Sequence, residues 1–91
     1  MKKDMVNHPS HYNLPGRKEC FDEMLEFFGV EAFKHFCLLN VYKYVYRAEA
    51  KNGEEDWKKA ENYADKFLEM GGSPQLLTET MFRARGGDAD E

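Results

Sequence analysis

The feature that most constrains the fold is a segment from Glu31 to about Ala50 that contains neither glycine nor proline. These two residues interrupt helices more strongly than any others. Glu31 places an acidic side chain where it favours a helix N-terminus. The segment therefore predicts one long helix of about five turns, at about 3.6 residues per turn.

The apolar residues of this helix cover more than one stripe, which predicts burial on two sides. They are Phe33, Phe36, Cys37, Leu38, Val41, Tyr42, Val45 and Tyr46. An earlier, shorter helix is predicted over 19–28, where Phe21, Met24, Leu25 and Phe28 recur at three-and-four spacing, and Gly29 ends it. Residues 6–16 contain two prolines with Asn, Ser and Gly, which predicts an irregular arm.

After the long helix, Asn52-Gly53 predicts a turn. Glu54, Glu55 and Asp56 then favour the start of another helix. Its apolar stripe comprises Trp57, Ala60, Ala64, Phe67 and Leu68, and Gly71-Gly72 ends it. Ser73-Pro74 has the pattern of an N-cap followed by a first-turn proline, which predicts a final helix from Pro74 to about Arg83.

Together these elements predict an all-α protein, a compact bundle of three to four helices. We expect an irregular N-terminal arm at 1–18, a single helical domain at 19–85 and a disordered acidic tail at 86–91. Seven Phe, five Tyr and one Trp exceed what so short a chain comfortably buries, so we also expect a homo-oligomer with its ligand site at or near a subunit contact.

Charge and hydropathy exclude several classes of protein. A net charge of -4 argues against general nucleic-acid binding, which needs a broad cationic surface. No apolar run approaches the roughly 20 residues that span a bilayer, and the first residues lack the apolar stretch of a signal peptide, so we expect a cytoplasmic protein without membrane contact. Cys20 and Cys37 lie in apolar runs, which is typical of small buried hydrophobes rather than of a disulfide framework.

Two polar stripes carry the functional interpretation. Asn40, Lys43, Tyr44 and Arg47 share one face of the long helix, and Asp56, Lys59, Tyr63 and Lys66 repeat that spacing on the next helix. If the helices are antiparallel neighbours, the stripes could face one another. Arg47 would then contact phosphate, the lysines would supply point charges, Asn40 would contact a base edge or ribose, and Tyr44 or Tyr63 would stack. On spacing alone, a solvated helix face explains the stripes better.

His8 and His11 lie in the arm, where they could contact phosphate or act in acid-base chemistry. Capping a helix or filling a subunit contact explains them about equally well. Two histidines do not make a zinc site, and neither HExxH nor CxxC spacing is present, so we predict no metal site. The glycine-rich phosphate loops are absent too, so any phosphate contact would have to use side chains.

An ordered set of motifs resembles the SaV-like nucleotide-kinase family of bacteriophages, small phage proteins long described as a domain of unknown function. The motifs are Asn7-His8-Pro9-Ser10-His11-Tyr12, Glu19-Cys20-Phe21-Asp22, Asn40 with Lys43-Tyr44 and Arg47, and Asp56 with Lys59-Ala60 and Tyr63. The resemblance covers about residues 6–70. It implies a protein of the infected bacterial cytoplasm and phosphoryl transfer from a nucleoside triphosphate to a deoxynucleoside monophosphate.

On this hypothesis the catalytic candidates are His8, His11, Arg47 and Asp56. The substrate-binding candidates are Asn40, Lys43, Tyr44, Lys59 and Tyr63. Magnesium would arrive with the triphosphate, and no tightly bound cofactor is expected. Two alternatives stay open: a non-catalytic phage protein that sequesters a host signalling nucleotide, and a protein-interaction module that uses the aromatic surface.

Overall fold

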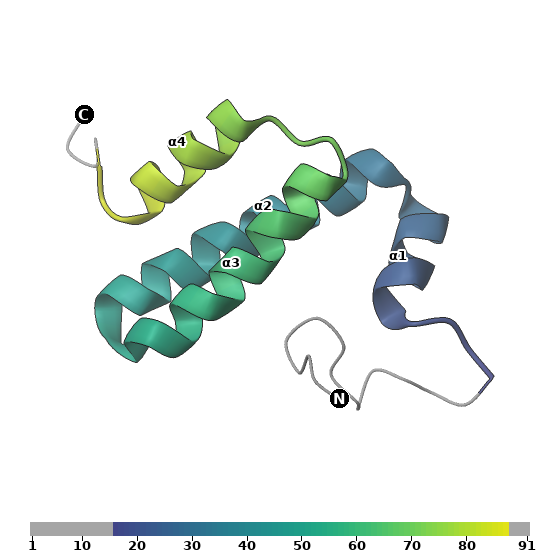
Figure 1. Cartoon of the computed structure of the whole chain (residues 1–91), viewed down its shortest axis with the longest axis horizontal. Coiled ribbons are helices and arrows are strands. Elements are labelled where there is room, and N and C mark those ends of the chain that lie inside the picture. Colours follow the sequence, from purple (N-terminus) through teal and green to yellow (C-terminus); the bar gives the residue numbers. More distant parts are fainter. Residues whose placement is uncertain (1–15, 88–91) are drawn as a thin grey trace. The chain divides into compact units, whose positions relative to one another are not determined.

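The computed structural model describes residues 16–87, and every regular element in that range is helical (Figure 1). The all-α class predicted from the sequence is therefore confirmed, with four α-helices and one π-helical turn. The chain separates into two compact units, residues 1–33 and 34–91. The finer division into an arm at 1–18, a helical domain at 19–85 and a tail at 86–91 stays a prediction.

In the first unit, α1 (Cys20–Phe28) lies within the predicted range, with Glu19 as its N-cap residue. Gly29 ends the helix at φ 93°, a left-handed conformation that glycine adopts without a steric penalty. Phe21 packs edge-to-face on Phe33 with ring centroids 5.8 Å apart. Phe28 departs from the predicted stripe, because 65% of it is exposed.

The long helix α2 (Val30–Arg47) is confirmed, although its end differs from the predicted Ala50. Residues Ala48–Asn52 form a π-helical turn, and α3 (Gly53–Glu69) begins directly after it. The Gly53 N–H donates to the carbonyl of Ala48, five residues back, and Gly53 has φ 51°. A wide helical turn thus replaces the predicted Asn-Gly break, and it keeps backbone groups paired while the chain reverses.

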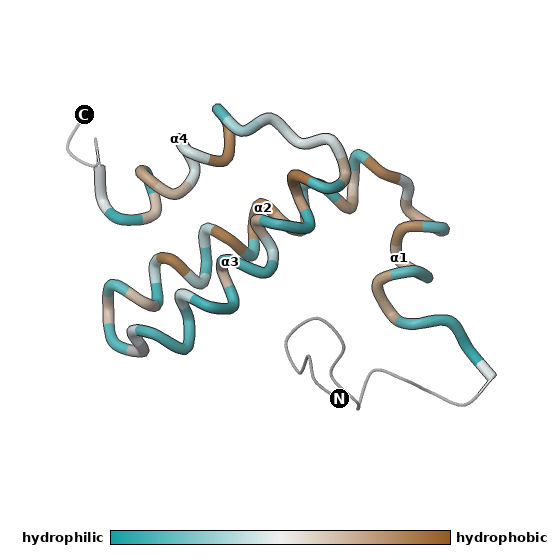
Figure 2. The backbone as a smooth tube through the Cα atoms, in the orientation of Figure 1, coloured by the Kyte–Doolittle hydropathy of each residue, from teal (hydrophilic) through white to brown (hydrophobic). Residues whose placement is uncertain are grey.

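The core of the second unit lies between α2 and α3, which run side by side (Figure 1). Val41 and Val45 on α2 are fully buried, and Ala60, Ala64 and Phe67 are buried on α3. Alanines at two of these positions allow the helices to approach closely. The hydropathy colouring shows apolar positions recurring along both helices (Figure 2).

Two parts of the predicted apolar surfaces are not covered within the described residues. On α2, Tyr42 is 40% exposed and Tyr46 is 62% exposed, so within the described part of a single chain the helix is buried on one side. On α3, Leu68 is 41% exposed. Leu68 follows Phe67 directly, and neighbouring residues of a helix point about 100° apart, so only one of the pair faces α2.

The final helix α4 (Pro74–Ala84) matches its predicted start. The Ser73 hydroxyl accepts a hydrogen bond from the Leu76 N–H at 3.1 Å, and Leu77 and Ala84 are buried. Upstream, the Gly72 N–H donates to the carbonyl of Phe67 at 2.8 Å and closes the end of α3. Among the described residues, no helix combines the length and the apolarity that crossing a bilayer requires.

Candidate functional site

The π-helical turn brings the two predicted polar stripes together on one side of the α2–α3 hairpin. Tyr44 of α2 and Tyr63 of α3 stack with ring centroids 5.9 Å apart and an interplanar angle of 9°. Tyr63 also meets Phe36 edge-to-face, with centroids 5.7 Å apart. The ring of Tyr63 thus fixes the spacing between the helices at the centre of the two stripes.

Three cationic side chains gather at the Tyr44 ring. The Nζ of Lys43 is 4.7 Å from the ring centroid, the Nζ of Lys59 is 5.5 Å away, and the Cζ of Arg47 is 5.7 Å away. Each lies within the distance at which a cation is attracted to an aromatic face. We call Lys43, Tyr44, Arg47, Lys59 and Tyr63 the Tyr44 cluster. It comprises residues from both stripes, which the sequence had predicted could face one another.

Asp56 lies beneath one edge of the Tyr44 cluster. Its Oδ2 is 3.3 Å from the Nε of Arg47, and its side chain is 2% exposed, while that of Arg47 is 48% exposed. The contact is within ion-pair distance, yet this buried Oδ2 has no hydrogen-bond partner in the described structure. Buried carboxylates are normally hydrogen-bonded, so Asp56 is an exception that calls for a functional explanation.

Asp56 was expected in the first turn of α3, where its charge would favour the helix start. It does stand there, but its side chain faces α2 instead of solvent. Three cations thus lie at the Tyr44 ring, and the carboxylate that pairs with one of them, Asp56, is covered. Like charges in close proximity repel, so this arrangement favours an additional anion.

Asn40 lies one turn before Tyr44 on α2. Its Nδ2 donates to the carbonyl of Phe36 at 2.9 Å, so one amide hydrogen is used within the helix. Burial raises the pKa of the Cys37 thiol, and the charge of Lys66, at the far end of the second stripe, opposes that larger effect. His8 and His11 lie outside the described residues. Their predicted roles stay predictions.

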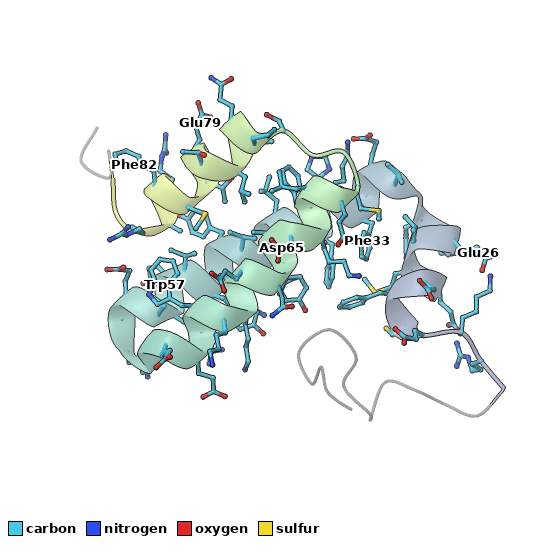
Figure 3. All side chains as sticks on the ribbon, viewed as in Figure 1. Glu26, Phe33, Trp57, Asp65, Glu79 and Phe82 are labelled. Atoms are coloured by element: carbon cyan, nitrogen blue, oxygen red, sulfur yellow. The ribbon has the colours of Figure 1, made fainter. Side chains whose placement is uncertain are left out.

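A second charged and aromatic group was missed by the sequence analysis. The guanidinium of Arg85 lies 5.7 Å from the ring of Trp57 and its Nε lies 3.3 Å from Glu49 Oε2. Trp57 and Arg85 border an open hollow of about 680 Å³ that Met81 and Phe82 also line. Trp57 on α3 and Phe82 on α4 are labelled in Figure 3. No local pattern could have found this group, because its members come from three elements.

Comparison with known proteins identifies the family of the chain. A family model described as "protein of unknown function (DUF3310)" matches residues 6–65. The chain belongs to the DUF3310 family. The matched range includes every candidate site residue from His8 to Tyr63.

A relative of this DUF3310 protein is the Gene 1.7 protein of Enterobacteria phage T3. It is 38% identical over 69 residues, and the match covers 71% of this chain and 42% of the phage T3 protein. The chain thus spans less than half the length of that relative. The match supports the bacteriophage origin that the sequence resemblance implied, and neither description names an activity. No solved structure matches the chain.

Proposed function

We propose that this DUF3310 protein binds a nucleotide through its phosphates at the Tyr44 cluster and transfers a phosphoryl group from a nucleoside triphosphate to a deoxynucleoside monophosphate. The observation that carries the proposal is the convergence of Lys43, Arg47 and Lys59 on one ring from two helices. On a chain of net charge -4, such a concentration of positive charge is local. A small anion fits it better than a long polyanion does.

The chemistry of the three cations suits phosphate. The guanidinium of Arg47 offers a planar fork of donors, and the two ammonium groups act as point charges. Phosphoryl transfer requires mainly positioning and neutralisation of the charge on the transferred group. A cluster that supplies cations from two rigid helices meets both requirements. Magnesium would be held chiefly by the oxygens of the triphosphate.

Asp56 has a positioning role in this proposal. Its carboxylate lies 3.3 Å from Arg47 Nε and orients the guanidinium at the edge of the Tyr44 ring. The Arg47 side chain is 48% exposed, so a ligand can reach the guanidinium from solvent. Asn40 would contact a base edge or the ribose, and Tyr44 or Tyr63 would stack on the base, as the sequence analysis predicted.

The decisive experiment incubates the protein with ATP, magnesium and each deoxynucleoside monophosphate, and separates the products by ion-exchange chromatography. Lys59→Ala should lose diphosphate formation. Lys58→Ala is the matched control, because Lys58 is the adjacent, exposed lysine on α3. Equal product formation in the two variants would show that the activity does not depend on the Tyr44 cluster, and no diphosphate from the unmodified chain would exclude the kinase.

A non-catalytic nucleotide binder is the second candidate. The observation that favours it is the burial of Asp56, the carboxylate at the cluster, whose side chain is 2% exposed and therefore covered from a bound metal ion. Calorimetry with mononucleotides and cyclic nucleotides separates the two functions. A binder takes up ligand that is afterwards recovered unchanged, whereas a kinase converts it when the phosphoryl donor is added.

A further inference from the structure

One face of α4 contributes four side chains to the hollow that Trp57 borders. Their spacings of three, one and three residues place them on one side of the helix. They are Thr78, Met81, Phe82 and Arg85. Together with Trp57 of α3 they line an open space of about 680 Å³, which we call the Trp57 hollow. Trp57 and Phe82 lie at the same end of the second unit (Figure 3).

The turn that ends α4 forms the rim of the Trp57 hollow. The Gly87 N–H donates to the carbonyl of Phe82 at 3.0 Å, and the Gly86 N–H donates to the carbonyl of Arg83 at 3.0 Å. These are the two hydrogen bonds of a Schellman motif, which closes the end of a helix. Both glycines line the hollow, so hydrogen-bonded backbone fixes its rim.

The charge at the Trp57 hollow favours an uncharged ligand. Arg85 is the one charged side chain among the described residues that line it. The Nε of Arg85 lies 3.3 Å from Glu49 Oε2, so its charge already has a partner. The guanidinium would repel a cationic ligand, and an anionic ligand would have to compete with Glu49 for it. A neutral ligand meets neither cost.

The side chains of the Trp57 hollow suit a flat ring with hydrogen-bond acceptors at its edge. The rings of Trp57 and Phe82 and the thioether of Met81 all pack favourably on aromatic groups. The guanidinium of Arg85 lies 5.7 Å from the Trp57 ring, so a flat, delocalised group is already accommodated beside the indole. Arg85 and the Thr78 hydroxyl are hydrogen-bond donors. Concave sites of about 300–1,000 Å³, mostly apolar with a few polar groups, are typical of small-molecule pockets.

We propose that the Trp57 hollow is a second ligand site, distinct from the Tyr44 cluster, and that it takes the uncharged ring of a nucleobase. Nucleobases are flat rings that carry carbonyl and ring-nitrogen acceptors, so they match the aromatic walls and the donors together. Proteins commonly hold unpaired bases by stacking them on aromatic side chains. The choice of a nucleobase over other neutral flat rings rests on the proposed nucleotide function, whereas the shape and the charge of the hollow do not.

Trp57 is the single tryptophan of the chain, so its fluorescence reports on the hollow directly. The full chain is titrated with the uncharged nucleosides guanosine, adenosine, cytidine and thymidine, with excitation at the red edge of tryptophan absorption, beyond the nucleoside bands. At least one nucleoside should quench the fluorescence to saturation, with a dissociation constant of about 1 mM, because stacking of a single base is a weak interaction. Failure of all four nucleosides to give saturable quenching would overturn the proposal.

Matched phenylalanine variants locate the ligand. Phe82→Ala should weaken nucleoside binding about tenfold, the loss expected for one aromatic contact with a base. Phe27→Ala is the control, because Phe27 is an 81% exposed phenylalanine on α1, outside the hollow. Thr78→Phe should abolish binding, because the larger side chain fills the space, and circular dichroism checks that each variant stays helical. Equal affinities of the two alanine variants, or binding that survives Thr78→Phe, would refute the site.

A second probe tests the assignment to a base. N-acetylphenylalaninamide is uncharged and has an aromatic ring, but that ring carries no hydrogen-bond acceptors. It should bind at least about tenfold more weakly than the best nucleoside, because it leaves the donors at the hollow without their partners. Equal binding would show a contact for the aromatic side chain of a protein and would overturn the assignment.

Inorganic tripolyphosphate separates this inference from the proposed function. It has no ring, so it should bind at the Tyr44 cluster and not in the Trp57 hollow, and calorimetry measures that binding in the unmodified chain and in Lys59→Ala. If tripolyphosphate binds through Lys59 but no nucleoside quenches Trp57, the second site is refuted and the Tyr44 cluster is supported. If nucleosides quench to saturation but tripolyphosphate does not bind, the second site is supported and the phosphate site of the proposed function is refuted.

Discussion

The guanidinium Nε of Arg47 on α2 lies 3.3 Å from the carboxylate Oδ2 of Asp56 on α3, and the two side chains differ sharply in exposure, at 48% and 2%. Arg47 can be hydrated by solvent when it loses its partner, whereas Asp56 cannot. Removing Arg47 and removing the charge of Asp56 should therefore change the stability of the fold by different amounts.

Arg47→Ala should destabilise the protein by about 1–3 kcal/mol, because it leaves a buried carboxylate without its cation. Asp56→Asn should change stability by less, since it removes the charge that is costly to bury and leaves a cation that reaches water. Urea unfolding followed by circular dichroism measures both changes. If Asp56→Asn cost more than Arg47→Ala, the buried carboxylate would not be the strained member of the pair.

The cationic character of the Tyr44 cluster predicts the salt dependence of ligand binding. Lys59→Ala should weaken nucleotide binding about tenfold, the loss expected for one charge-assisted contact, and should flatten the decline of affinity with added salt. Titration calorimetry at several salt concentrations measures both effects. Lys58→Ala serves as control. A nucleotide affinity that is insensitive to salt would show that phosphate contacts do not drive binding.

Gly72 should not tolerate a side chain. A Cβ at this position would lie 2.5 Å from the ring of Phe67, which is 3% exposed and has no room to move. Gly72→Ala should therefore cost about 1–3 kcal/mol through overpacking. Gly87→Ala makes a similar contact, 2.4 Å from the ring of Phe82, but that ring is 54% exposed and can rotate into solvent. In thermal unfolding, the melting temperature of Gly72→Ala should lie well below that of Gly87→Ala. Equal melting temperatures would contradict the packing argument.

Burial raises the pKa of the Cys37 thiol from 9.0 to about 11. Because the folded state holds this proton more tightly than the unfolded state does, Cys37 contributes stability that is complete below pH 9.0 and is lost as the pH rises toward about 11. Within that window the free energy of unfolding should fall by about 1.4 kcal/mol per pH unit through this group. Cys37→Ala should remove this part of the slope. Identical slopes for the two proteins would show that the thiol is not desolvated.

Many features of the fold are determined by local sequence. Gly29 and Gly72 set where α1 and α3 end, and Ser73-Pro74 sets where α4 begins. Each of these signals acts on backbone groups within one or two helical turns. The absence of glycine and proline likewise predicted α2 without reference to any other part of the chain. These signals are short-ranged, so the sequence alone is sufficient to identify them.

Burial was decided by the tertiary structure. The periodicity of α2 marks Val41 and Tyr42 equally as apolar, and only the position of α3 decides that Val41 is fully buried while Tyr42 is 40% exposed. The π-helical turn at Ala48–Asn52 sets how α3 faces α2, and with it the placement of Asp56 against Arg47. The sequence determined which residues share a helix face. Which faces meet depends on the rotation between two helices, and one turn of different width changes that rotation for every residue that follows.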